Sequence, residues 1–274
     1  MDFLTTQQIT DYYERHKTTE LTLTKDIIEA AGIVTKQIAL KCREDLLPCV
    51  IYSLSFSNAK IIADSRTGLV QKLKDANQVG SLRLYFNNGT ANPLVSFVTF
   101  KMGWYTPYGG DKDMALMQLQ FTNRPPDDVI IIMGKILDAY ANFIKHKEER
   151  IPITPETQNK LHIVSPTTFI FIQGFKSPCI LRDISFYDAK VIVMVPFEDF
   201  KGCEAVLTID FKEPFRSFSL KGTCTRPEVV KDRKDLTAMS IVFNYDAVPI
   251  EYKIRINEYI IQQSRFDRER KREE

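Results

Sequence analysis

The pattern of apolar and polar positions divides the chain into two β-rich stretches separated by one long amphipathic segment. In the first stretch, short runs rich in Ile, Val, Phe and Tyr predict strands near residues 34–42, 48–56, 59–64, 81–86, 94–105 and 114–122. Turn clusters separate them, such as Asn87-Asn88-Gly89 and Gly109-Gly110-Asp111. Strands that follow one another this closely favour an antiparallel barrel or sandwich, because a parallel sheet needs intervening helices.

Two short helices are predicted before these strands and one long helix after them. Residues 5–16 have helical character, and Thr24 to Ala31 predict a helix that Gly32 closes in the left-handed conformation. The long helix follows Pro125-Pro126, and its apolar stripe consists of Met133, Ile136, Leu137, Tyr140 and Ile144. Acidic residues at its start and basic residues at its end complement the helix dipole.

The second stretch repeats the β pattern. Strands are predicted near residues 161–164, 168–173, 179–184, 189–195, 204–211, 216–225 and 237–244, followed by a helix from about Pro249 to Arg265. Alternation within Thr168-Phe-Ile-Phe-Ile predicts that Phe169 and Phe171 are buried in the core, as is Phe186. This half is predicted to be a six- or seven-strand antiparallel unit with a helix at each end.

We therefore predict a mainly β protein in three parts. Residues 1–124 form a first β domain, residues 125–149 a connecting helix and linker, and residues 150–274 a second β domain with a C-terminal helix. The charged tail after Arg265 is interpreted as a solvated helix end rather than as an arm that binds nucleic acid.

Composition narrows the classes of function. The 274 residues are 44% apolar and 26% charged with a net charge of +2, which lacks the basic excess of a general nucleic-acid coat. Five cysteines without CxxC spacing predict reduced, mostly buried thiols and neither a disulfide framework nor a zinc site. Neither a signal peptide nor an apolar run long enough to span a membrane is found, so we expect a cytoplasmic protein.

The residue patterns of common enzymes are missing. The three histidines, His16, His146 and His162, are widely spaced, and the chain has no GxSxG, P-loop or GxGxxG motif after a strand. Adjacent carboxylates such as Asp127-Asp128 are better explained by a helix start than by acid–base catalysis. We therefore expect no catalytic residues, no metal and no enzyme activity.

Two polar segments of the second half stand out. The basic segment Lys145 to Arg150 precedes the strand-like Ile151-Pro152-Ile153, and the segment Arg182 to Asp188 lies between two predicted strands. In order, spacing and strand context, residues 143–265 resemble the PilZ family of cyclic di-GMP receptors. The ligand site of that family combines an RxxxR segment with a [D/N]xSxxG motif on a small β-barrel.

The resemblance assigns roles to individual residues. Arg150 takes the second arginine of RxxxR, His146 falls where the first is expected, and Lys145 takes a preceding position that is often basic. Asp183 and Ser185 match the second motif. Asp188, however, occupies the position of its glycine. The resemblance thus implies a cyclic di-GMP site formed by Lys145, His146, Arg150, Asp183 and Ser185, with no other cofactor.

These residue types suit that ligand chemically. A guanidinium such as that of Arg150 grips a phosphate or the O6/N7 edge of guanine with two parallel hydrogen bonds. The Asp183 carboxylate accepts from guanine N–H groups, and the Ser185 hydroxyl bonds a base or a phosphate. His146 cannot form a forked contact, and the Asp188 carboxylate repels a nearby phosphate.

The first half also resembles part of a known family. The stretch from Gln37 through Ala63 is similar to the N-terminal PilZ-like barrel of spirochaete PilZ proteins. It contains no RxxxR or [D/N]xSxxG equivalent, so the resemblance implies a role in packing or in contact with a partner protein.

Several functional hypotheses remain open at this point. The leading one is a receptor that binds cyclic di-GMP near the connection between its halves, changes their arrangement and regulates a partner process such as motility. The alternative is a degenerate PilZ scaffold that acts only through contacts with an unidentified protein. The basic segment could also be a solvated helix end, and Asp183 with Ser185 an ordinary turn. A nucleic-acid partner is disfavoured.

Overall fold

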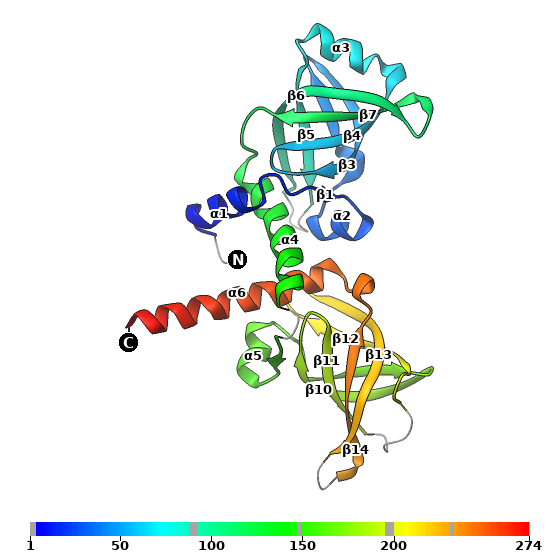
Figure 1. Cartoon of the computed structure of the whole chain (residues 1–274), viewed down its shortest axis with the longest axis vertical. Coiled ribbons are helices and arrows are strands. Elements are labelled where there is room, and N and C mark those ends of the chain that lie inside the picture. The colour runs from blue at the N-terminus through cyan, green and yellow to red at the C-terminus, as the bar shows by residue number, and fades with distance from the viewer. Residues whose placement is uncertain (1–3, 88–91, 147–148, 195–199, 231–232, 274) are drawn as a thin grey trace. The chain divides into compact units, whose positions relative to one another are not determined.

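The chain forms two β-barrels. The structure is a computed structural model that describes residues 4–87, 92–146, 149–194, 200–230 and 233–273. It divides into two compact units, Met1–Asp138 and Ala139–Glu274, each built around a closed antiparallel barrel (Figure 1). The predicted fold class is confirmed. The boundary between the units lies inside a helix, and the domain limits at residues 124 and 149 stay a prediction.

The first unit closes its barrel through six strands. Neighbouring strands follow the order β3-β2-β5-β6-β7-β4, β4 pairs back with β3, and β1 adds to the outer side of β3. Its elements are α1 (Thr6–His16), β1 (Leu21–Thr22), α2 (Lys25–Ala31), β2 (Ala39–Cys42), β3 (Asp45–Leu54), β4 (Asn58–Asp64), α3 (Leu69–Asp75), β5 (Val79–Phe86), β6 (Leu94–Tyr108) and β7 (Asp111–Phe121), with 3-10 turns at Thr35–Gln37 and Ser65–Thr67.

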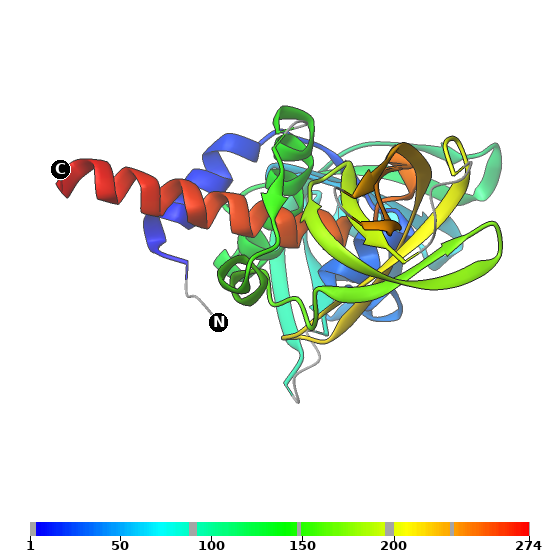
Figure 2. The ribbon, with the colours of Figure 1, turned by 90° about the horizontal axis from the view of Figure 1, so that it is seen from below.

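The second unit repeats this arrangement. The order β10-β9-β12-β13-β14-β11 closes through the pairing of β11 with β10, and β8 adds to β10. Figure 2 shows these strands curving around the barrel from below. The elements are α4 (Asp127–Lys145), which begins in the first unit, β8 (Ile151–Pro152), α5 (Pro155–Lys160), β9 (Thr167–Ile172), β10 (Phe175–Ile184), β11 (Asp188–Val193), β12 (Glu204–Phe211), β13 (Arg216–Val230), β14 (Arg233–Phe243), a 3-10 turn at Tyr245–Ala247 and α6 (Ile250–Glu273).

Local sequence signals account for several element boundaries. Thr5 and Gln8 form a capping box at the start of α1, and Gly32 ends α2 with a φ of 66°. Gly109 and Gly110, with φ values of 59° and 81°, form the two-residue turn between β6 and β7. The predicted helix over residues 5–16, the end of α2 at Gly32 and the turn at Gly109-Gly110 are confirmed, whereas Asn88 and Gly89 of the other predicted turn lie outside the described residues.

One predicted strand is wrong, and one helix was not predicted. Residues 161–164 do not form a strand: α5 ends just before Leu161, and Ile163 makes a single bridge to Phe211. A run as short as Leu-His-Ile-Val fits a capped turn as well as a strand. In the first unit, α3 was not predicted, because its sequence LVQKLKD buries only Leu69 and Leu73 and is too short to show helical periodicity.

The alternation in β9 is present, but its phase is the reverse of the predicted one. Thr168, Ile170 and Ile172 are buried, whereas Phe169 and Phe171 are 45% and 39% exposed. Alternation fixes which residues share a face but not which face meets the core. The prediction of buried rings is therefore wrong for Phe169 and Phe171 and right for Phe186.

The core of the second unit includes one face of the C-terminal helix. Tyr252, Ile256 and Ile260 of α6 are buried in the barrel's hydrophobic core and Tyr259 packs against it, as the spacing predicts. The helix then extends beyond the barrel in both views (Figures 1 and 2). In the part of the chain that the structure describes, no helix combines the length and the apolar character needed to cross a membrane.

The five cysteines are free, as predicted. Four are buried, and Cys203 is partly exposed. Burial raises the pKa of the Cys49 and Cys179 thiols to about 12. These thiols therefore stay protonated and pack as small apolar groups.

The two barrels are copies of one pattern, which the sequence analysis missed. Residues 48–60 (PCVIYSLSFSNAK) and 178–190 (PCILRDISFYDAK) share Pro-Cys, Ser-Phe and Ala-Lys at equivalent places. Both segments carry a β-bulge, between Ile51 and Ser53 in one and between Leu181 and Asp183 in the other. The short edge strands also correspond, because Leu21 faces Leu54 and Ile151 faces Ile184. Glu20 and Arg150, each one residue earlier, therefore occupy equivalent positions.

A buried ion pair fixes α1 in the first unit. The Asp138 carboxylate, 3% exposed, lies 2.9 Å from Nε2 of His16 and 2.6 Å from Nη1 of Arg15. Burial raises the pKa of Asp138, but the hydrogen bond from His16 and the charge of Arg15 outweigh it, so the pKa lies below its usual value. His16 thus has a structural role that its sequence context did not reveal.

We expect His16→Ala to lower the free energy of unfolding of the first unit by about 2 kcal/mol, because it leaves a buried carboxylate with one exposed partner. Chemical denaturation followed by the fluorescence of Trp104, the chain's single tryptophan, on β6, reports this unit. The pKa of Asp138 is lower in the folded protein than in the unfolded chain, where it is near 4. The contribution of Asp138 to the free energy of unfolding is therefore complete above the unfolded-state pKa and is lost as the pH falls through the folded-state pKa. An unchanged midpoint and an unchanged acid dependence would refute this role.

Candidate functional site

The short edge strand β8 brings Arg150 to the end of β10. Ile151 and Pro152 pair with Ile184 and Asp183, so the preceding residue, Arg150, lies beside the turn that joins β10 to β11. Its Nη1 is 2.6 Å from Oδ1 of Asp183, and its Nη2 forms an ion pair with Oδ2 of Asp188. Two of the predicted ligand residues, Arg150 and Asp183, are thus in direct contact.

A β-bulge sets the direction of Asp183. The register between β10 and β11 shifts between Leu181, which is buried, and Asp183, whose side chain is 21% exposed. The extra residue of a bulge re-aims the side chains that follow it. The Asp183 carboxylate consequently reaches Arg150 at the barrel surface, while Ile184 returns to the core.

Ser185 lies in the same turn but points inward. Its side chain is buried, and Oγ accepts hydrogen bonds from the backbone N–H groups of Tyr187, at 3.1 Å, and Asp188, at 3.0 Å. The hydroxyl lies 2.7 Å from Oδ1 of Asp188, to which it donates. In this structure the Ser185 hydroxyl therefore holds the turn, and its predicted contact with ligand stays a prediction.

The other two predicted residues lie earlier in the chain. Lys145 is the last residue of α4 and is exposed. Nδ1 of His146 is 2.7 Å from Oε2 of Glu149, so the imidazole is engaged within its own segment. The structure thus joins Arg150 to Asp183, whereas the partner of His146 among the described residues is Glu149. Lys147 and Glu148 lie outside those residues.

Two tyrosines anchor the turn through contacts that the sequence analysis did not predict. Tyr187 donates from its hydroxyl to the carbonyl of Phe143, at 2.7 Å, and its ring stacks on the Phe143 ring with 4.3 Å between centroids. Tyr252, fully buried, donates to the carbonyl of Ser185 at 2.8 Å. Burial raises the pKa of both phenols, so both remain donors. The turn that carries Asp183 and Asp188 is therefore held from α4 and from α6.

The equivalent position in the first unit carries the opposite charge. Glu20 accepts from Nζ of Lys60, at 2.8 Å, and from the hydroxyl of Ser53. The hydrogen bonds from Lys60 and Ser53 lower the pKa of Glu20. Glu20 is the counterpart of Arg150, and Ser53 is the counterpart of Asp183. The first unit therefore has a carboxylate at the position where the second unit has a guanidinium.

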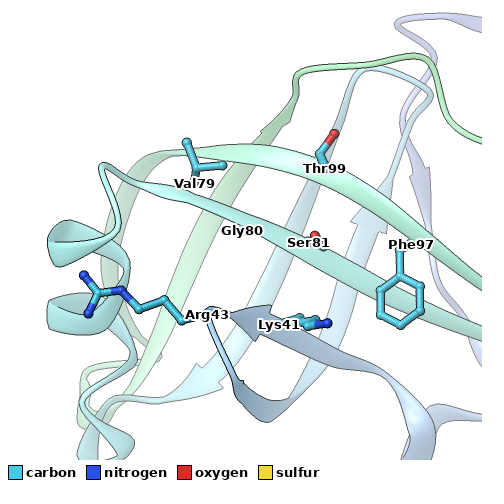
Figure 3. Close-up of a pocket in the computed structure, with 7 residues that line it drawn as sticks. All are labelled: Lys41, Arg43, Val79, Gly80, Ser81, Phe97 and Thr99. Atoms are coloured by element: carbon cyan, nitrogen blue, oxygen red, sulfur yellow. The ribbon is translucent and has the colours of Figure 1, made fainter.

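A pocket of about 280 Å³ lies on the first barrel (Figure 3). Figure 3 shows the Lys41 side chain pointing toward Phe97, while Arg43 points away toward α3, where it donates to the carbonyl of Asp75 at 2.6 Å. The lining residues are Lys41, Arg43, Val79, Gly80, Ser81, Phe97 and Thr99. None of them is a predicted ligand residue.

Within the residues that the structure describes, no group of three or more His, Cys, Asp and Glu side chains is placed to hold a metal ion. The chemistry of the Arg150 cluster is that of a guanidinium with two carboxylate partners, which suits recognition of polar and anionic groups.

Comparisons with known proteins give one domain family and one sequence relative. Residues 7–140 match the model of the PilZN3 domain. A cyclic di-GMP binding protein of Treponema denticola is 31% identical over 261 residues, which cover 94% of this chain and 83% of that protein.

Two solved structures are similar over most of their length. The PlzA protein of Borreliella burgdorferi in complex with c-di-GMP is 24% identical with a TM-score of 0.43, and the match covers 93% of this chain and 99% of PlzA. YcgR of Escherichia coli in complex with c-di-GMP is 12% identical with a TM-score of 0.29, covering 97% of this chain and 94% of YcgR.

Proposed function

The chain belongs to the PilZ family, as a two-barrel member with an N-terminal PilZ-like domain, and on this premise we propose that it is a cyclic di-GMP receptor. The observation that carries the proposal is the contact between Arg150 and Asp183, because it joins the two predicted motifs at one place on the second barrel. The ligand of the Treponema denticola relative supports the choice of nucleotide.

The proposed binding mode uses the polar groups at the barrel surface. The Arg150 guanidinium grips a ligand phosphate or the O6/N7 edge of a guanine, and Asp183 accepts from guanine N–H groups. Lys145 and His146 add positive charge or a hydrogen bond from the preceding segment. Ser185 supports the site by holding the turn, and it contacts ligand only if the turn opens.

The proposed output is a change in the arrangement of the two units. Helix α4 runs from the first unit into the second and ends at Lys145, shortly before Arg150. A ligand that orders this segment against the second barrel favours one arrangement through its differential contacts. We propose that this change regulates a protein partner in the cytoplasm, for example in motility.

The alternative is a scaffold without ligand, which acts through protein contacts alone. Three contacts between polar side chains favour it. Arg150 is already paired with both Asp183 and Asp188, and His146 is paired with Glu149. In this alternative the cluster only stabilises the barrel edge.

Titration of the purified chain with cyclic di-GMP separates the two candidates. We expect saturable heat in calorimetry and a rise in the midpoint of thermal unfolding, because a ligand that binds only the folded state stabilises it by about 2.7 kcal/mol at 100 times its dissociation constant. Cyclic di-AMP serves as the control, since adenine lacks the O6 acceptor and N–H donors of guanine. The absence of heat and of any thermal shift favours the scaffold.

A further inference from the structure

We infer that Asp188 is an internal competitor of the ligand: its carboxylate holds the guanidinium of Arg150 and must release it before an anionic ligand binds. This inference rests on the proposed function, which assigns Arg150 to the ligand. It adds a residue that sets affinity by opposing binding rather than by contributing a contact.

The first observation is the occupancy of the guanidinium. Nη1 of Arg150 binds Asp183 and Nη2 binds Asp188, so two carboxylates fill the fork that matches two oxygens of a phosphate. The Arg150 side chain is 36% exposed, and those of Asp183 and Asp188 are 21% and 20% exposed. The cluster is therefore reachable from solvent, and a ligand can exchange with one of its members.

The second observation indicates that Asp188 is the member that gives way. The Asp188 carboxylate also accepts from the Ser185 hydroxyl at 2.7 Å, so it keeps a hydrogen bond when Arg150 turns to the ligand. Asp183 also has a use in the complex, because its carboxylate complements guanine N–H donors. The second carboxylate has no such use beside a phosphate.

The third observation comes from the first barrel, where the counterpart of Asp188 is Asn58. Ser55 accepts there from the N–H groups of Ser57, at 3.2 Å, and Asn58, at 3.0 Å, just as Ser185 does in the second barrel. A neutral side chain therefore supports the same turn. The turn therefore does not need the charge of Asp188 in order to fold, and the main effect of that charge is on Arg150.

The charges give the direction of the effect. Arg150 contributes +1 and the two carboxylates −2, so the cluster carries −1 toward a ligand with two phosphates. Replacing Asp188 with Asn makes the cluster neutral and frees one side of the guanidinium. We expect the dissociation constant of cyclic di-GMP to fall about tenfold in Asp188→Asn, since a partly screened charge at this distance changes affinity by roughly that factor.

The test is a calorimetric titration of the full chain, Asp188→Asn and Asp210→Asn with cyclic di-GMP. Asp210→Asn is the matched control: it removes one carboxylate from the same barrel, on β12, which pairs with β9 and β13 and not with the strands of the site. Thermal unfolding without ligand verifies that each variant is folded. Tighter binding in Asp188→Asn alone supports the inference, including the case in which only this variant binds measurably.

Failure of this inference and failure of the proposed function give different results. If the unmodified chain binds and Asp188→Asn binds equally or more weakly, the competitor is refuted while the receptor stands. If both variants tighten alike, general charge accounts for the effect and the competitor is again refuted. If no folded protein binds, the proposed function and the inference both fail.

Discussion

Arg150→Ala is expected to weaken cyclic di-GMP binding about 100-fold, the largest loss of affinity that a single change at the site produces. The guanidinium supplies paired, charge-assisted hydrogen bonds, and each such bond contributes roughly 1.5–3 kcal/mol. The same change removes the partner of Asp183 and Asp188 and leaves two carboxylates close together. The repulsion of an anionic ligand therefore adds to the lost contacts. Calorimetry with the full chain measures the effect.

Two further variants make this result specific. Arg150→Lys keeps the charge but not the fork, so we expect it to recover only part of the affinity. Arg182→Ala is the matched control, because it removes an exposed arginine from the same strand, β10. Equal losses in Arg150→Ala and Arg182→Ala would indicate nonspecific attraction by positive charge. Full binding by Arg150→Ala would remove Arg150 from the site.

The sequence was sufficient for the fold where local chemistry is strong. Glycines with positive φ marked the end of α2 and the turn between β6 and β7. The sequence was insufficient where one pattern of apolar residues fits two different structures. The phase of β9 depends on which face meets the core, and this is decided by the partner strands rather than by the strand's own alternation.

The contact between Arg150 and Asp183 could be predicted from the sequence, whereas the contacts that support the neighbouring turn could not. Arg150 and Asp183 were named from their motifs, and the pairing of β8 with β10 brings them into contact. The inward direction of Ser185 depends on the buried turn, and the support from Tyr252 depends on contacts 67 residues apart in sequence. No spacing rule reveals such contacts, because they form only when α6 packs on the barrel.

One signal was present in the sequence and was overlooked. Comparing residues 48–60 with 178–190 shows that the chain repeats itself, and the structure extends this repeat to the edge strands. The repeat makes Glu20 the counterpart of Arg150, so this edge of the first barrel carries a carboxylate paired with Lys60 in place of a guanidinium.

Tyr252→Ala is expected to lower the free energy of unfolding of the second unit by about 4 kcal/mol, in the range for removing a buried aromatic side chain. The Tyr252 ring is fully buried and meets the rings of Phe211, Phe218 and Phe243 edge to face, at 6.0 to 6.3 Å between centroids. Tyr252→Phe keeps this packing and loses only the hydrogen bond to Ser185, so about 1–2 kcal/mol is expected.

The spectroscopic probes separate this effect from a general loss of stability. Far-UV circular dichroism follows both units, whereas the fluorescence of Trp104 follows the first, so Tyr252→Ala should move the former transition and leave the latter in place. Phe175→Ala is the matched control, because this ring lies in the same barrel but is 78% exposed, and its removal should cost less than about 0.5 kcal/mol.

Because Tyr252 also holds the turn between Asp183 and Asp188, Tyr252→Phe should weaken ligand binding as well as stability, whereas Phe175→Ala should weaken neither. Full affinity in Tyr252→Phe would show that the turn keeps its geometry without α6.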